Sequence, residues 1–203
     1  MHLDEEGQKQ AHRQMLRGAL DEAHLSDVEI GEHHTCDGGL DDFRHVIKLG
    51  VGTSDQGHLR VGAWARGTRK VIPIPNCKVA APELRQIMLS IARLVIDLGL
   101  WPYKPELDQG VLRSFVLRAS KETGLILVTV VAGRRIREIQ EFADQLMDRH
   151  SSISGVWLHL NDESGNSIFS RDEEGAIKAT YLAGSPTIQE KIAAAALANS
   201  KQK

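Results

Sequence analysis

The sequence has no long apolar run and few aromatic residues. Apolar residues never approach the ~18 in succession that a membrane-spanning helix needs, and the segment from Met1 to Glu6 lacks the basic-then-apolar pattern of a signal peptide. We therefore expect a soluble, cytoplasmic protein that does not bind membranes. Aromatic residues make up 4% of the 203 residues, so the core must consist mainly of Val, Ile, Leu and Ala.

Cysteine is also scarce. Cys36 and Cys77 are too few for a disulfide framework or for a four-thiolate metal site. Zinc could be coordinated by His33, His34 and Cys36, but no second ligand pair follows at zinc-finger spacing, which favours a polar loop. No Ser, His and Asp form a recognisable catalytic triad. The motif Gly50-Val51-Gly52 is followed by a strand pattern where a phosphate site needs a helix, so we expect a hairpin turn there.

The net charge of −2 conceals an uneven distribution. Residues 1–43 carry 11 acidic and 3 basic side chains, whereas residues 44–93 carry 9 basic and 2 acidic ones, and residues 112–137 carry 6 and 1. A basic segment inside a nearly neutral chain is typical of proteins that bind nucleic-acid phosphates. Solvated outer faces of strands would give the same pattern, so charge alone leaves both interpretations open.

The spacing of apolar residues predicts the secondary structure. Helical periodicity is found at 4–24, 82–98, 135–149 and 188–199. Strand patterns are found at 43–49, 59–66, 70–74, 112–118, 125–131, 155–160, 167–171 and 176–182. The segment 125–131 is apolar on both faces, which predicts a central strand that is covered on both sides.

The grouping of these elements indicates the fold class. Strands cluster around two main amphipathic helices instead of alternating with them, so we expect an α+β fold with an antiparallel or mixed sheet and additional terminal helices. The order hairpin, helix, strand occurs in the basic segment and again at 112–160, which suggests a repeated unit. We expect an acidic N-terminal helix and loop (1–42), a central α+β domain (43–187) and a C-terminal helix with a polar tail (188–203).

The central domain contains a candidate binding face. Arg60, Trp64 and Arg66 fall on one face of an expected strand, a combination suited to phosphate contact and base stacking. Alternatively, Trp64 packs under a helix and the arginines reach solvent. The complete set of candidate RNA-binding residues is Arg44, Arg60, Trp64, Arg66, Arg69, Lys70 and Arg113.

Several segments, in order, resemble the RNA (uracil-5-)-methyltransferases of the RumA and TrmA class. The stretch from Arg66 to Cys77 is similar to that family's Gly-Phe-(basic)…Ile-Val-Asp-Ile-x-x-Cys element, and the four residues from Phe43 stand where the family has Tyr-Arg-Asn-Lys. The strand at 112–118 resembles Leu-Arg-His-Leu-Val-Ile-Arg, and residues 155–161 resemble Gly-Ile-x-x-x-x-Asn. The resemblance covers about residues 2–188, which correspond to the central domain of these enzymes.

The resemblance implies an RNA-contacting central domain of an S-adenosylmethionine-dependent enzyme that acts on structured RNA, either rRNA or tRNA. The family's N-terminal β-barrel, glycine-rich cofactor loop and catalytic cysteine have no counterpart in this sequence. We therefore expect a truncated or excised segment that has no catalytic residues, binds no cofactor by itself and works with a separate catalytic domain. The alternative is a stand-alone, non-catalytic module that binds RNA or a protein.

The resemblance also gives Cys77 a counterpart. This residue aligns with the distant cysteine of the four-iron cluster that many family members carry. The three clustered cysteines that complete such a site have no counterpart here, so Cys77 is expected to be an orphan ligand that binds no metal.

Overall fold

The chain divides into two compact units, residues 1–43 and 44–203. The computed structural model describes residues 4–34 and 40–190. In the first unit, helix α1 (Glu5–Glu22) begins where the Asp4 side chain accepts a hydrogen bond from the backbone N–H of Gly7. None of its residues is buried. The segment that follows is held by Arg17, which donates to the carbonyls of Ser26 and Val28.

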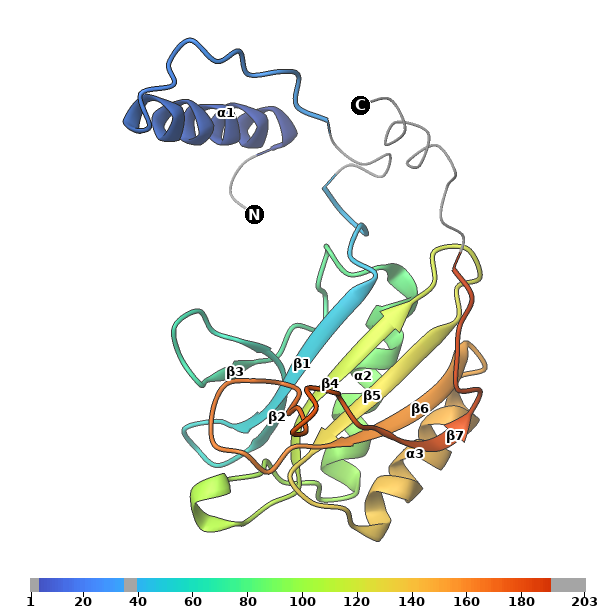
Figure 1. Cartoon of the computed structure of the whole chain (residues 1–203). Coiled ribbons are helices and arrows are strands. Elements are labelled where there is room, and N and C mark those ends of the chain that lie inside the picture. The colour runs from blue at the N-terminus through green and yellow to red at the C-terminus, as the bar shows by residue number, and fades with distance from the viewer. Residues whose placement is uncertain (1–3, 35–39, 191–203) are drawn as a thin grey trace. The chain divides into compact units, whose positions relative to one another are not determined.

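The second unit is built on one seven-stranded sheet with the order β3-β2-β1-β4-β5-β6-β7 (Figure 1). All neighbouring strands are antiparallel except β5 and β6, which run parallel. The strands are β1 (Val46–Thr53), β2 (Leu59–Trp64), β3 (Val71–Ile72), β4 (Leu112–Ala119), β5 (Ile126–Ala132), β6 (Ile153–Leu160) and β7 (Thr180–Gly184). The expected α+β class with a mixed sheet is therefore confirmed.

Two long helices cover one face of this sheet (Figure 1). Helix α2 (Pro82–Asp97) starts with a proline, whose missing N–H is not needed in the first turn, and its backbone turns away at Gly99, which has a φ of +60°. Helix α3 (Arg137–Arg149) connects the parallel strands β5 and β6. The short 3-10 helix η1 (Pro105–Leu107) lies between α2 and β4. No helix among the described residues is long and apolar enough to cross a bilayer.

The core lies between the sheet and these two helices. The residues of α2 that face the sheet recur every three or four positions and are all buried: Leu84, Ile87, Met88, Ile91, Leu94 and Val95. Phe142 of α3 stacks on Phe115 of β4, with ring centroids 5.3 Å apart. Burying one large aliphatic side chain contributes about 1.5–3 kcal/mol, so this layer dominates the stability of the unit. Strand β5 lies between β4 and β6 and is mostly buried, but the helices cover only one of its faces, and Leu127 and Thr129 on the other face are half-buried, so the predicted cover on both sides is only partial.

Two local predictions are wrong. The motif Gly50-Val51-Gly52 is not a hairpin turn but lies inside β1, and the turn comes later, at residues 54–58. No strand forms at 167–171, which belongs to an irregular segment between β6 and β7. The side chains of Asn161 and His159 bind backbone groups of this segment in place of a neighbouring strand.

The expected repeat is not reproduced either. After α2 the chain returns to β4, which pairs antiparallel with β1, whereas after α3 it returns to β6, which pairs parallel with β5. The two halves therefore differ in topology. The expected C-terminal helix, 188–199, falls largely outside the described residues.

The glycines of β1 and β2 allow a close approach on the face of the sheet that α2 and α3 leave uncovered. A Cβ at Gly50 would lie within 2.8 Å of the Trp64 indole nitrogen, and a Cβ at Gly52 would lie 2.8 Å from a methyl group of Val71. At Gly62, a Cβ would meet the backbone of Ile72. Glycine within a strand often marks such an approach. It allows β3 and the Trp64 ring to lie against β1.

We predict that Gly50→Ala lowers the free energy of unfolding by about 1–3 kcal/mol, because the added methyl group overlaps the Trp64 ring. In a Trp64→Ala background the same change should have little effect, since the overlapping ring is gone. Denaturant unfolding of the wild type, the two single variants and the double variant measures the coupling between the two positions. Additive effects would show that Trp64 does not pack on Gly50.

A side-chain hydrogen bond connects the two core helices. His150, which follows α3, lies with Nε2 2.6 Å from the hydroxyl of Ser90 on α2. Burial, assisted by the neighbouring Arg149, lowers the pKa of His150 below its usual value. The folded protein therefore favours the neutral imidazole.

We predict that acid destabilises the fold partly through His150. Its pKa is lower in the folded state than in the unfolded state, so the unfolded chain binds more protons once the pH falls below about 6.5. Stability is then lost until the pH passes the folded pKa. His150→Gln should reduce the loss between pH 7.5 and 5.5, measured by denaturant unfolding at constant ionic strength. An unchanged loss in the variant would contradict this assignment.

Candidate nucleic-acid interface

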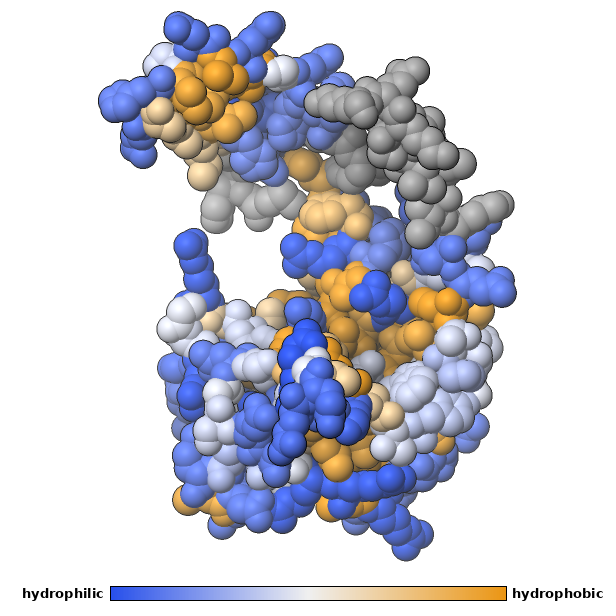
Figure 2. All heavy atoms as spheres, in the orientation of Figure 1, coloured by the Kyte–Doolittle hydropathy of each residue, from blue (hydrophilic) through white to orange (hydrophobic). Residues whose placement is uncertain are grey.

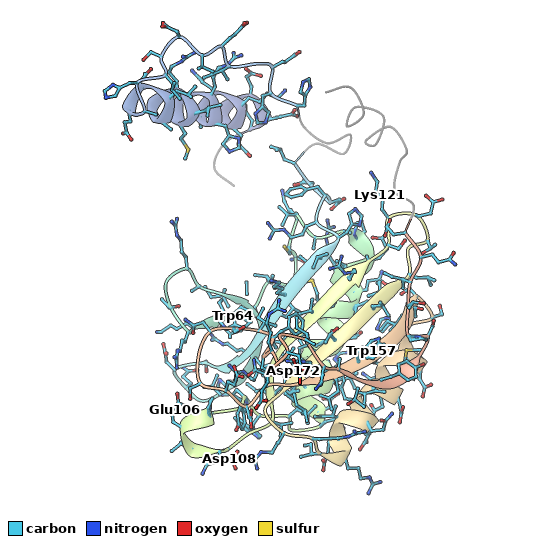
Figure 3. All side chains as sticks on the ribbon, viewed as in Figure 1. Trp64, Glu106, Asp108, Lys121, Trp157 and Asp172 are labelled. Carbon is cyan, nitrogen blue, oxygen red and sulfur yellow. The ribbon has the colours of Figure 1, made fainter. Side chains whose placement is uncertain are left out.

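The face of the sheet that carries no helix, here called the open face, faces the viewer in Figure 3. Its strands are unusual in charge: all seven together contain Lys48, Arg60, Arg113 and Arg118 but no Asp or Glu. Figure 2 shows apolar surface beside hydrophilic side chains on this face. An apolar surface that is surrounded by positively charged side chains can accept both the bases and the phosphates of a nucleic acid.

Strand register arranges the open face in rows. The middle row runs across five strands and consists of Lys48, Val116, Thr129, Trp157 and Tyr181. Arg118 lies in the next row, paired with Val46 and Leu127. Lys48, Arg118 and Tyr181 are exposed, whereas the side chains between them are half-buried. Trp157 and Tyr181 meet edge to face, with their ring centroids 5.5 Å apart.

The row on the other side of the middle row is covered. It contains Ser114, Val131 and His159, and all three residues are buried. The cover is the segment between β6 and β7, residues 161–179, here called the covering loop, which crosses in front of the sheet (Figure 1). Over β4, β5 and β6, the covering loop therefore limits the accessible part of the open face to the middle row and the row of Arg118.

Arg113 holds the beginning of the covering loop. Its guanidinium donates hydrogen bonds of 2.5–3.1 Å to the backbone carbonyls of Asn161, Glu163 and Gly165. Burial lowers the pKa of Arg113, which nevertheless stays fully charged. Asn161 in turn donates from Nδ2 to the carbonyls of Ser167 and Ile168. Sequence reasoning assigned Arg113 to RNA, but its guanidinium is occupied by the covering loop.

His159 holds the end of the covering loop. Its Nδ1 lies 2.7 Å from the carbonyl of Lys178, and its Nε2 accepts a hydrogen bond from the backbone N–H of Ser170. This pair of partners fits a neutral ring with the proton on Nδ1. Farther along the loop, Lys178 forms an ion pair of 2.8 Å with Asp172, and the hydrogen bond from Lys178 lowers the pKa of Asp172.

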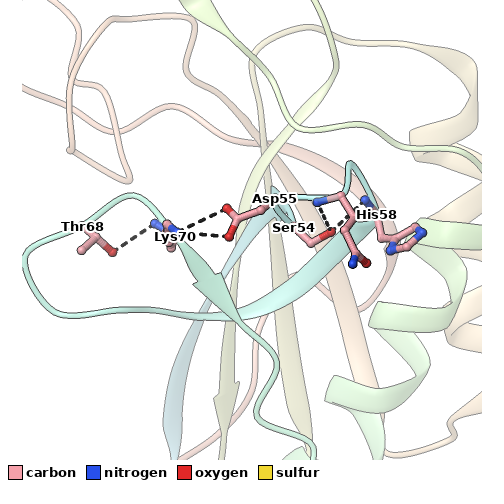
Figure 4. A network of polar contacts seen from close by, with 6 residues as sticks. Ser54, Asp55, His58, Thr68 and Lys70 are labelled. Carbon is pink, nitrogen blue, oxygen red and sulfur yellow. Dashed lines mark hydrogen bonds and ion pairs between the residues drawn. The ribbon is translucent and has the colours of Figure 1, made fainter.

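The other candidate residues lie in two places. Arg66, Arg69 and Lys70 belong to the turn between β2 and β3, because β2 ends at Trp64 and does not extend to Arg66 as expected. Lys70 forms an ion pair of 3.3 Å with Asp55 of the preceding turn (Figure 4), and Arg69 forms one of 3.8 Å with Glu106.

Arg60 and Trp64 share the open face by strand alternation, as expected from the sequence. Arg44 lies before β1, where its backbone pairs with residues 79–81. The candidate residues are therefore not gathered at one point.

Sequence reasoning missed four residues of the open face. Lys48 and Arg118 were visible as the charged positions of their strands, but the register that makes them neighbours was not. Trp157 and Tyr181 come from consecutive strands that are separated by the irregular residues 161–179, and only the β6–β7 pairing brings them together. An aromatic residue at an outward position of an otherwise apolar strand was the one signal that could have indicated Trp157.

The chain has relatives among known proteins. The chain is 31% identical over 199 residues to an uncharacterized RNA methyltransferase of Parasynechococcus marenigrum, covering 93% of this chain and 39% of that protein. It is 25% identical over 195 residues to one of Bacillus cereus, covering 94% and 40%. No family model matches. This chain resembles RNA methyltransferases over most of its length.

A solved structure has the same fold. It is the Pyrococcus abyssi tRNA (uracil-54, C5)-methyltransferase in complex with S-adenosyl-L-homocysteine, which superposes with a TM-score of 0.66 at 17% identity and covers 94% of this chain and 41% of that one. The chain spans about two fifths of the length of these RNA methyltransferases.

The described residues include one parallel β-α-β unit, β5-α3-β6, and a glycine follows its first strand. Gly133, in the one parallel β-α-β unit, is closed off because the ring of Tyr103 fills the space over it. The described segments contain no group of three His, Cys, Asp or Glu side chains arranged to hold a metal, and Cys77 is their one cysteine. His33 lies 5.5 Å from the ring of His12, and Cys36 lies outside the described residues.

We predict that Arg113→Ala releases the covering loop, because three backbone carbonyls lose a charged donor. Trypsin should then cleave faster at Arg171 and Lys178, and the free energy of unfolding should fall by about 1.5–3 kcal/mol. Arg118→Ala is the matched control, since Arg118 is exposed and makes no hydrogen bond or ion pair with the described residues. Equal cleavage rates in both variants would contradict the role of Arg113.

Proposed function

We propose that this chain is the RNA-contacting domain of an S-adenosylmethionine-dependent RNA (uracil-5-)-methyltransferase, and that structured RNA, such as a tRNA, binds on the open face. The observation that carries the proposal is the charge of the sheet: its seven strands contain three exposed cations, Lys48, Arg60 and Arg118, and no acidic residue. The relatives support RNA as the ligand, because they are named as RNA methyltransferases.

The cations of the middle and adjacent rows are available for phosphate contact. Lys48 and Arg118 occupy diagonal positions on neighbouring strands, a separation of roughly 7–8 Å or less between side-chain bases. Both are exposed, and neither side chain has a hydrogen bond or ion pair with the described residues. Two unpaired cations at this separation can contact the phosphates of one strand. The cations of the β2–β3 turn extend the positive surface beside them.

The proposal assigns binding, not methyl transfer, to this chain. Relatives of the chain are about two and a half times as long as the part it matches. Arg113 and His159 are occupied by backbone groups of the covering loop, and Ser114 is buried beneath it. The domain therefore positions RNA.

We predict that replacing Lys48 and Arg118 together with Ala weakens binding to a tRNA transcript and reduces the slope of log K against log salt by roughly 1.5 units. Fluorescence anisotropy between 50 and 200 mM salt measures both quantities. Arg66→Ala with Arg69→Ala should act in the same direction, because these exposed residues contribute to the same positive surface.

The matched control removes two arginines from the helical side. Arg93 on α2 and Arg137 on α3 are exposed, and changing both to Ala alters the net charge equally. This variant should bind RNA with the wild-type slope of log K against log salt. If it weakens binding as much as the open-face variant, net charge and not the open face governs binding, and the proposal fails.

A further inference from the structure

We propose that Trp157 and Tyr181 form a stacking platform for an unpaired nucleobase, so that the open face binds a single-stranded stretch of RNA. This inference rests on the proposed function and deepens it, because it specifies which part of a structured RNA is bound. The platform lies at the β6–β7 end of the middle row.

The distribution of tryptophan supports the platform. The chain has 3 Trp residues, and two of them, Trp64 and Trp157, lie on the open face (Figure 3). Trp64 packs over Gly50 and is still 40% exposed. Trp157 has no helix above it, since α2 and α3 cover the opposite face. Neither Trp64 nor Trp157 belongs to the core between the sheet and the helices.

The geometry of the pair leaves room for a base. Trp157 and Tyr181 meet at an interplanar angle of 67°, so they do not stack face to face. Among the described residues no other ring contacts either of them. Tyr181 is 40% exposed. One ring therefore buttresses the other from the side, and a planar ligand can lie on an aromatic face.

The rest of the middle row suits an RNA strand that continues from the platform. Thr129 and Val116 are the next residues across the sheet, and both are short, so they form a low floor beside the Trp157 ring. Lys48 and Arg118 follow on β1 and β4. Because neighbouring strands lie about 4.8 Å apart, Trp157 and Lys48 are separated by roughly 14 Å. Sheets with exposed aromatic residues stack two or three bases over such a width.

A double helix does not fit this surface as well. Its bases are stacked inside the duplex, so they can reach an aromatic platform only if they are splayed out. The covering loop closes the sheet on one side of the middle row and leaves a strip across the strands. A single strand can follow this strip with bases on the floor and phosphates on Lys48 and Arg118.

The test compares Trp157→Ala, Trp157→Phe and Trp101→Ala in binding a single-stranded oligouridylate and a perfectly paired RNA duplex of the same length. Stacking contributes enough per base that Trp157→Ala should weaken oligouridylate binding about 10-fold to 100-fold. The salt slope should stay the same, because no phosphate contact is lost. Trp157→Phe should retain most of the affinity, and duplex binding should not change. Trp101, which is exposed but lies outside the strands, is the control.

A second measurement does not depend on the stability of the Ala variant. In a Trp64→Phe, Trp101→Phe protein, Trp157 is the single tryptophan, and stacking should quench its fluorescence as oligouridylate is added. Wild-type affinity in a folded Trp157→Ala variant, or an unchanged Trp157 emission at saturation, would overturn the platform. If RNA still binds, and if replacing Lys48 and Arg118 still weakens that binding, the proposed function survives. If no RNA binds to the wild type, both proposals fail.

Discussion

Both long helices of the second unit pack on the same face of the sheet, and this one-sided burial decides what the opposite face can be. The apolar stripes of α2 and α3 are used entirely against that one face. The other face must then be solvated, be covered by irregular chain or be occupied by a partner. In this protein the covering loop takes one part of it, and the strip with Lys48, Trp157 and Tyr181 stays accessible.

Irregular chain can lie over a sheet only where its backbone groups find partners. The covering loop meets this condition through Arg113, Asn161 and His159, which together bind backbone groups along most of its length. These side chains come from the ends of β4 and β6, next to the strands that the loop covers. The same interactions that fix the loop also remove Arg113 from the binding surface. One part of this face therefore holds the loop, and the neighbouring rows carry the exposed cations.

At the other end of the sheet, glycine sets the shape. Gly50, Gly52 and Gly62 permit Trp64 and β3 to lie against β1, where any side chain would collide. This packing also positions the β2–β3 turn, which contains Arg66 and Arg69. Ion pairs of Arg69 and Lys70 with Glu106 and Asp55 are exposed and contribute little to stability. They leave these cations free to exchange partners for phosphates.

The sequence by itself determined the three α-helices of the described residues, most strands, the α+β class and the position of β5 inside the sheet, because apolar periodicity and turn residues act locally. It also indicated a basic central segment and a resemblance to RNA methyltransferases. Only the tertiary structure decided which side chains share a face. Gly50-Val51-Gly52 looked like a turn because close approach of Trp64 is a long-range contact, and Arg113 looked like an RNA contact because its partners lie about 50 residues away. The row from Lys48 to Tyr181 depends on strand register, which is fixed by packing between distant segments and not by any local pattern.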